Sequence, residues 1–197
     1  MWSVVTVDVF DQWFLLLTAG EQESVLTGIF KLQALGPQLG RPDADSLQGS
    51  KKIRNLKELR IQHKGRPYRV LYAFDPLRQA VMLCGGDKTG NKRFYETMIP
   101  VAEREFLAHL ATLAKPLSAL IAKTHPDVVR AAKVRAEQEI LELRLAQLRE
   151  QLELSQTELA GRLGISQPSV ANLEKRGAEI KLSSLKRYVE AMGGQAA

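Results

Sequence analysis

Residues 56–74 read LKELRIQHKGRPYRVLYAF and predict two paired β-strands. In the first part of this stretch the apolar residues Leu59 and Ile61 alternate with polar ones, which is the pattern of a half-buried strand. RVLYAF (69–74) predicts the second strand, and AVMLCGG (80–86) predicts a short buried third strand after the turn DPLRQ. These three segments therefore predict an antiparallel meander.

The residues on both sides of the meander complete an α+β domain. VVTVDVF (4–10) predicts a strand, residues 11–36 predict helices, and the Gly/Pro/Asp-rich residues 36–50 predict a loop. RFYETMIPVAEREFLAHLATL (93–113) predicts a helix. We therefore expect the first domain to cover residues 1–113, with a small antiparallel sheet and flanking helices.

The rest of the chain predicts helices and no strand. Residues 114–137 predict a connector that leads into a long helix, and residues 138–197 predict an all-α helix-turn-helix domain. LSQTELAGRLGISQPSVANLEK (154–175) contains two short helices, with the small Ala160 at their contact and Gly164 in the turn. Glycine suits that turn because the backbone there must be left-handed.

The order of these residues resembles the helix-turn-helix of the lambda-repressor/Cro type. The resemblance implies that the second helix enters the major groove of DNA, and that the protein is a homodimer reading paired half-sites about one turn apart. A helical hairpin without DNA contact is the alternative. The residues expected to meet base edges or phosphates are Gln156, Ser166, Gln167, Ser169, Asn172 and Lys175.

The first domain carries a concentrated positive charge. Eight basic residues lie between Lys51 and Arg69 against one acidic residue, Glu58, so this stretch alone exceeds the net charge of +6 of the whole chain. Such density favours a phosphate-binding groove over an ordinary solvated surface. The residues expected to contact phosphates in addition are Lys57, Lys64, Arg66, Lys92 and Arg93.

The ordered segments LKELRIQHKGRPYRVLYAFDP and LCGGDKTGNKRFYE resemble toxins of the RelE/ParE superfamily, in its phage-derived HigB-like branch. The resemblance covers about residues 2–112 and implies metal-independent cleavage of mRNA, generally on the ribosome. It therefore implies that the phosphate-contacting residues named above, Lys57, Lys64, Arg66, Lys92 and Arg93, bind RNA. Matching by position implies that Arg60 and Arg69 stabilise phosphate and transition-state charge. It implies phosphate contact or proton transfer for Lys88, and base stacking or proton donation for Tyr95.

Two features of the expected site stay open. Tyr95 is equally well interpreted as a core aromatic residue of the last helix. Gly85 and Gly86 stand where related toxins often carry a histidine or an aromatic residue, so the general base is not assigned. His63 is a weaker candidate, because a single histidine on an exposed strand is more often incidental.

A RelE-type toxin followed by a Cro-type reader is the gene order of a HigB–HigA pair. The resemblance therefore predicts a fused type II toxin–antitoxin protein: an endoribonuclease (mRNA interferase) held inactive by a C-terminal HigA-like antitoxin domain that represses its own operon. We expect residues 115–139 to pack on the toxin domain. The alternatives are a transcriptional regulator with a catalytically inactive sensor or protein-binding N-terminal domain, and an interaction scaffold without nucleic-acid chemistry.

The composition of the chain excludes several other classes of protein. Cys84 is the single cysteine, which excludes a disulfide framework and a thiolate zinc site, and the three histidines lack metal-ligand spacing. We therefore expect neither metal nor cofactor. No apolar run reaches the roughly 18–20 residues needed to cross a bilayer, and the N-terminus is a poor signal peptide. The expected protein is cytoplasmic, with operator DNA, mRNA and the ribosome as partners.

Overall fold

The computed structural model describes residues 2–112, 115–175 and 182–192. The chain forms two compact units, Met1–Lys133 and Val134–Ala197, and each unit is described by itself below. The first unit is α+β and the second is helical, which confirms the predicted fold class.

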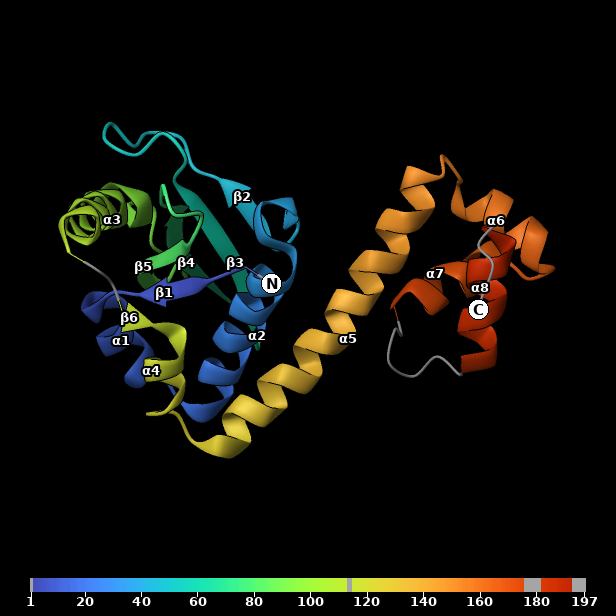
Figure 1. Cartoon of the computed structure of the whole chain (residues 1–197), viewed down its shortest axis with the longest axis horizontal. Helices are drawn as coiled ribbons and strands as arrows, with labels where there is room; N and C mark the ends of the chain where they lie inside the picture. The colour runs from blue at the N-terminus through green and yellow to red at the C-terminus, as the bar shows by residue number, and fades with distance from the viewer. Residues whose placement is uncertain (1, 113–114, 176–181, 193–197) are drawn as a thin grey trace. The chain divides into compact units, whose positions relative to one another are not determined.

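Within the described residues, the first unit contains one mostly antiparallel sheet in the order β2-β3-β4-β5-β1-β6 (Figure 1). Strand β1 pairs in parallel with β5, and every other neighbouring pair is antiparallel. The strands are β1 (Val4–Thr6), β2 (Ala44–Ser46), β3 (Lys57–His63), β4 (Arg66–Phe74), β5 (Ala80–Asp87) and β6 (Lys115–Pro116).

Helices cover both faces of this sheet (Figure 1). Gly85 and Gly86 are neighbours in β5, so a Cβ on each would point to opposite faces. A Cβ on Gly85 would meet Trp13 of α1, and one on Gly86 would meet Phe94 of α3. Gly28 of α2 lies against Ile61. The helices of this unit are α1 (Asp8–Leu15), α2 (Ala19–Leu35), the 3-10 turn η1 (Gly36–Gln38), α3 (Phe94–Ala111) and α4 (Leu117–Ile121).

The structure corrects three predicted segments. The strand expected over 4–10 ends at Thr6, and α1 begins at Asp8, because Phe10 and Phe14 recur one helical turn apart and are both buried. The loop expected over 36–50 contains β2, which pairs with β3. The connector expected to hold no strand contains β6, which pairs with β1 at the edge of the sheet.

The segment after β6 packs onto the first unit as far as Lys133. Leu117 and Leu120 of α4 are buried. Helix α5 (Pro126–Gln151) begins in this unit, and the Thr27 hydroxyl of α2 donates to the carbonyl of Ala132 at 3.5 Å. The start of α5 therefore lies against α2.

The second unit packs α5, α6 (Gln156–Leu163), α7 (Gln167–Lys175) and α8 (Leu182–Ala191) around an apolar core. Ser155 caps α6, accepting a hydrogen bond from the backbone of Glu158, whose carboxylate in turn accepts from Ser155. Gly164 ends α6 with φ +66° and ψ 33°, which confirms the left-handed turn. In the described residues no helix is both long and apolar enough to cross a membrane.

Candidate functional site

The two predicted catalytic arginines lie side by side on the sheet. Arg60 of β3 is directly opposite Arg69 of β4, and Arg69 is opposite Gly86 of β5. Residues in register across antiparallel strands share a face, so both arginines lie on the α3 side. Two like charges in this position repel each other, and the pair therefore needs a counter-charge.

Glu58 supplies that counter-charge. It stands two residues before Arg60 on the same face of β3 and is buried. Its Oε1 lies 3.7 Å from the Nε of Arg60, and its Oε2 lies 3.6 Å from the Nε of Arg69. Both separations are ion-pair distances, longer than normal hydrogen bonds. The carboxylate thus lies between the two guanidinium groups.

Tyr95 and Lys88 complete the same cluster. The Tyr95 hydroxyl donates to the Oε2 of Glu58 at 2.7 Å. The Nζ of Lys88 donates to the Tyr95 hydroxyl oxygen at 3.1 Å and lies 4.4 Å from the centroid of the Tyr95 ring. Three of the four predicted catalytic residues therefore contact Glu58, which the sequence analysis did not assign to the site, and Lys88 joins them through Tyr95. We refer to these residues as the Glu58 cluster: Glu58, Arg60, Arg69, Lys88 and Tyr95.

The cluster is accessible on one side only. The Arg60 side chain is 35% exposed, and Lys88 and Tyr95 are half-buried. The Arg69 side chain is only 6% exposed, and one of its Nη atoms donates to the carbonyl oxygen of Tyr68 at 2.8 Å. The expectation that both guanidinium groups face a phosphate therefore needs correction, because Arg69 lies beneath the surface against Glu58.

Among the predicted RNA-binding residues, Arg66 lies beside α2 in a different ion-pair group. Its guanidinium is 3.1 Å from the Oε1 of Glu21 and 2.7 Å from the Oδ2 of Asp87. The Tyr68 hydroxyl donates to Glu21 at 2.5 Å, and this bond is the main cause that lowers the pKa of Glu21 to about 2. Burial, with the same bond, raises the pKa of Tyr68 to about 12.

The other predicted RNA contacts are dispersed. Lys57 and Glu58 are neighbours in β3, so the side chain of Lys57 lies on the other face of the sheet from the Glu58 cluster. The Nζ of Lys57 donates to the Ser46 hydroxyl at 3.3 Å. Lys64 is exposed in the tight β3–β4 turn. Lys92 and Arg93 are exposed in the loop between Lys88 and α3. By position in the chain, only these last two adjoin the Glu58 cluster.

The glycines that depart from the family pattern have a packing reason. A Cβ on Gly85 would come within 2.2 Å of the Trp13 ring, and one on Gly86 within 3.0 Å of the Phe94 ring. His63, the weaker candidate for a base, is 2.9 Å from the Ser24 hydroxyl of α2, on the face opposite the cluster. Among the described residues, no group of His, Cys, Asp and Glu is arranged to hold a metal ion.

In the second unit, the first residues of the two helix-turn-helix helices contact each other. The amide nitrogen of Gln167 donates to the Oε1 of Gln156 at 2.7 Å, and Gln156 donates to the Oε2 of Glu174 at 2.7 Å. Buried Glu174 also accepts from Arg149 at 2.7 Å and from Tyr188 at 2.5 Å. This network fixes α6 and α7 relative to α5 and α8.

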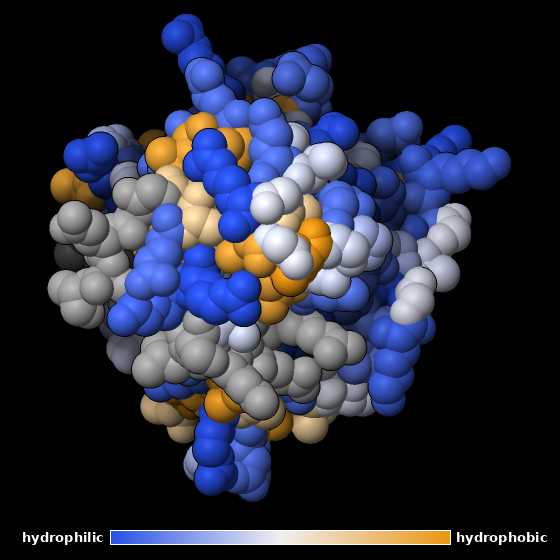
Figure 2. All heavy atoms as spheres, turned by 90° about the vertical axis from the view of Figure 1, so that its right-hand side faces the viewer, coloured by the Kyte–Doolittle hydropathy of each residue, from blue (hydrophilic) through white to orange (hydrophobic). Residues whose placement is uncertain are grey.

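The remaining predicted DNA contacts lie on α7 and at its start. The hydroxyl groups of Ser166 and Ser169 are 2.8 Å apart. Asn172 and Lys175 are exposed further along the helix. A view of the chain from the side of this unit shows mostly hydrophilic side chains around an apolar patch (Figure 2).

Comparisons with known proteins identify relatives of both units. Residues 12–107 match the family described as phage derived protein Gp49-like, and residues 145–196 match the helix-turn-helix family. The chain is 43% identical over 103 residues to the candidate toxin HigB3 of Mycobacterium tuberculosis, covering 52% of this chain and 88% of that protein.

Two further relatives come from the same organism. The candidate toxin HigB2 is 40% identical over 107 residues, covering 53% of each chain. The antitoxin HigA1 is 46% identical over 48 residues, covering 24% of this chain and 32% of the antitoxin. The chain thus spans about half of the former protein and a third of the latter. No solved structure matches the chain significantly.

Proposed function

This chain belongs to the HigB-type family of Gp49-like toxins, and from that premise we propose that its first unit is an endoribonuclease that needs no metal. A helix-turn-helix unit similar to the HigA antitoxin follows, so the architecture is that of a toxin fused to an antitoxin. The proposed substrate is mRNA on the ribosome. In the proposed arrangement, the second unit restrains the toxin and, as a homodimer, represses the operon.

The observation that carries the nuclease proposal is a connected cluster: two arginines and a tyrosine contact one buried carboxylate, and a lysine contacts the tyrosine. In the proposed reaction the 2′-hydroxyl of RNA attacks the adjacent phosphate. The bond from the 2′-oxygen to phosphorus forms and the bond to the 5′-oxygen breaks, leaving a 2′,3′-cyclic phosphate and a 5′-hydroxyl. The attacking hydroxyl gives up its proton, and the leaving oxygen gains one.

We assign a role in the proposed cleavage reaction to each residue of the Glu58 cluster. Arg60 and Lys88 reach the solvent side, where they stabilise the charge that grows on the phosphorane oxygens. Tyr95 shares its hydroxyl with Lys88 and Glu58, and so sits on a path for proton transfer. Buried Arg69 holds Glu58 in place and acts through it.

The nuclease proposal is tested with the full chain and with residues 1–133, on mRNA with and without ribosomes. Removing one preorganised hydrogen-bond donor that stabilises the charge of the transition state lowers the rate by a factor of about 10²–10³. Arg60→Gln should therefore lower the cleavage rate by about that factor. Arg41→Gln makes the same change at an exposed arginine outside the cluster and should cleave like the parent. A folded 1–133 fragment that cleaves no RNA under either condition excludes the nuclease.

One observation favours the second candidate, a transcriptional regulator with an inactive first unit. Glu58 and Arg69 are both buried, and their charges compensate each other inside the protein. A cluster of that kind is also compatible with a purely structural role. The same cleavage experiment separates the two, because the regulator leaves RNA intact while still binding its operator.

The DNA-reading proposal rests on the helix-turn-helix unit. Asn172 is exposed on α7, where an amide side chain can pair with an adenine edge. Asn172→Ala should therefore cost about 1–3 kcal/mol at one base position and relax specificity there. Binding selection on randomised DNA measures the change, and equal weakening on every sequence would remove Asn172 from the base-reading set.

A further inference from the structure

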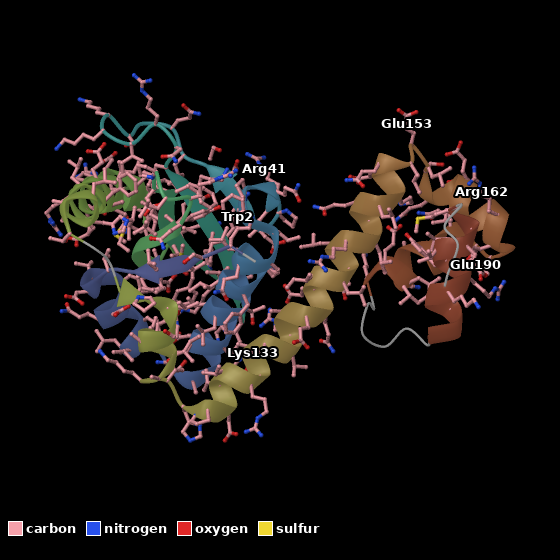
Figure 3. All side chains as sticks on the ribbon, viewed as in Figure 1. Trp2, Arg41, Lys133, Glu153, Arg162 and Glu190 are labelled. Atoms are coloured by element: carbon pink, nitrogen blue, oxygen red, sulfur yellow. The ribbon has the colours of Figure 1, made fainter. Side chains whose placement is uncertain are left out.

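The β2–β3 loop, residues 47–56, presents a group of exposed cations. Lys51, Lys52 and Arg54 are all solvent-exposed, and within the described residues their side chains form no ion pair. The loop extends beyond the sheet beside α3 in Figure 1, and nitrogen-tipped side chains project from it in Figure 3. The loop contains no regular secondary structure, but hydrogen bonds to Glu103 and two buried side chains, Ile53 and Leu56, fix its position.

A carboxylate of α3 holds the first half of the loop. The Oε1 of Glu103 accepts hydrogen bonds from the Ser50 hydroxyl at 2.8 Å and from the backbone N–H groups of Lys51 and Lys52 at 2.7 and 3.0 Å. Glu103 is buried, with 8% of its surface exposed to solvent. The hydrogen bond from Ser50, followed by the two backbone bonds, lowers the pKa of Glu103, so the group is ionised at neutral pH.

The second half is anchored by side chains that point inward. Ile53 and Leu56 are buried in the core under α3. The backbone N–H of Ile53 donates to the Ser50 hydroxyl at 3.0 Å. Fixing the loop in advance reduces the conformational entropy that a bound ligand would otherwise have to offset.

The loop differs in this respect from the arginines of the neighbouring strands. Arg66 is paired with Glu21 and Asp87, and Arg69 is paired with Glu58. The carboxylate of Glu103 interacts with the charge of Lys52 and offsets part of the positive charge of the loop. With three cations against this one carboxylate, the loop keeps a net positive charge. An ordered group of cations with a net positive charge is the electrostatic footprint of a phosphate-binding surface.

The loop and the Glu58 cluster adjoin the same helix on the same face of the sheet. Tyr95, at the start of α3, contacts Glu58, and Glu103, eight residues further on, contacts the loop. Eight residues of α-helix span about 12 Å. A single RNA strand bound at the cluster can therefore continue along α3 to the loop.

We propose that the β2–β3 loop is a second binding site for the RNA backbone, with Lys51, Lys52 and Arg54 contacting phosphates. Glu103 is its positioning residue. The site extends the proposed nuclease function, on which it rests, by binding the strand away from the cleaved bond. It makes the substrate a stretch of several nucleotides, because a dinucleotide does not reach the loop.

The test measures binding of the full chain to a labelled single-stranded RNA with 2′-O-methyl groups, across a range of salt. Each phosphate contact contributes about −0.7 to the slope of log affinity against log salt on single strands. Replacing Lys51, Lys52 and Arg54 together with Gln should therefore make the slope less negative by about 2 and lower the affinity by about tenfold or more. The matched control replaces the exposed Arg41, Lys123 and Lys133 with Gln and should leave the slope almost unchanged.

Glu103→Gln separates a positioned loop from general electrostatic attraction. The change raises the net charge by one, so general attraction predicts tighter RNA binding. The proposal predicts weaker binding, because the ionised acceptor of three hydrogen bonds is lost. Ser50→Ala removes one of these bonds without changing any charge, and should weaken RNA binding in the same direction.

Two results overturn the loop proposal. One is an equal effect on RNA binding of the triple replacement of Lys51, Lys52 and Arg54 and of its control, and the other is tighter RNA binding by Glu103→Gln. The nuclease proposal fails by a different result. The methylated RNA lacks the attacking hydroxyl, so its binding is measured independently of cleavage. Absence of cleavage of ordinary RNA by the folded 1–133 fragment, with and without ribosomes, contradicts the nuclease proposal alone.

Discussion

At the scale of single residues, Glu58 is the group on which the candidate site depends. The sequence placed Arg60 on the face opposite Leu59, and the structure agrees. The sequence could not show that Arg69 is buried. Alternation along a strand indicates on which face of the sheet a side chain lies, but not how far that side chain is exposed to solvent. Nor could the sequence show that Tyr95, from a helix 37 residues away, meets Glu58. The sequence feature that could have identified Glu58 is that it is the single acidic residue among the eight basic residues between Lys51 and Arg69.

Replacing Glu58 should destabilise the fold as well as impair the site. Glu58→Gln leaves buried Arg69 without its counter-charge, and breaking a buried pair in this way costs about 3–5 kcal/mol. Glu96→Gln is the matched control, because Glu96 is 74% exposed and pairs with Arg93 at the surface, where a pair contributes about 0–1 kcal/mol. Urea unfolding of both variants measures the difference. Equal, small losses would mean that Glu58 is not the centre of the cluster.

Glu21 should make stability depend on pH in the acid range. Its pKa is lowered from 4.5 to about 2, chiefly by the Tyr68 hydroxyl, so the folded protein favours the ionised form. Its stabilising contribution is complete above pH 4.5 and disappears as the pH falls toward about 2. The difference in unfolding free energy between the parent and Glu21→Gln should therefore shrink over this window. A difference that stays constant from pH 6 to pH 2 would contradict the assignment.

At the scale of elements, the long strands of the meander and the helix-turn-helix followed from periodicity and from turn residues. The elements that sequence reasoning missed are β2 and β6, which are three and two residues long. Strands so short carry no periodic pattern, and they form only because β3 and β1 offer them partners. Similarly, Gly85 in β5 differs from the histidine or aromatic residue of related toxins, and the structural reason is the Trp13 ring, which lies on the face opposite the Glu58 cluster.

A pair of glycine substitutions tests this packing. Gly85→Ala places a methyl group against Trp13, where overpacking costs about 1–3 kcal/mol. Gly161→Ala, inside α6 with nothing within 4 Å of its Cβ, should stabilise its unit by about 0.5–1 kcal/mol. Thermal unfolding of each variant gives the sign. Opposite signs are expected, and a neutral Gly85→Ala would remove the close approach of α1 to β5.

At the scale of the whole molecule, the division at Lys133 shows how much of the chain belongs with the toxin-like unit. Strand β6, α4 and the start of α5 all pack there, next to β1 and α2. The Glu58 cluster lies on the other face of the sheet, under α3. The described segment up to Lys133 therefore leaves the cluster uncovered.

This arrangement predicts which fragment of the first unit is stable. Residues 1–133 should unfold cooperatively. Residues 1–113 lack the edge strand and the buried Leu117 and Leu120, each worth about 1.5–3 kcal/mol of burial, and should melt at a much lower temperature. Circular dichroism melts of both fragments make the comparison. Equal melting temperatures would show that the segment after residue 114 is not part of this unit's core.

The most direct test of the central claim is the chemistry of the RNA ends left by residues 1–133. Cleavage by the Glu58 cluster should leave a 2′,3′-cyclic phosphate and a 5′-hydroxyl, should proceed in the presence of a metal chelator, and should be lost in Arg60→Gln. Mass spectrometry of the products identifies both ends. Ends carrying a 3′-hydroxyl and a 5′-phosphate, or mRNA left intact by the folded fragment in the presence of ribosomes, would contradict the account.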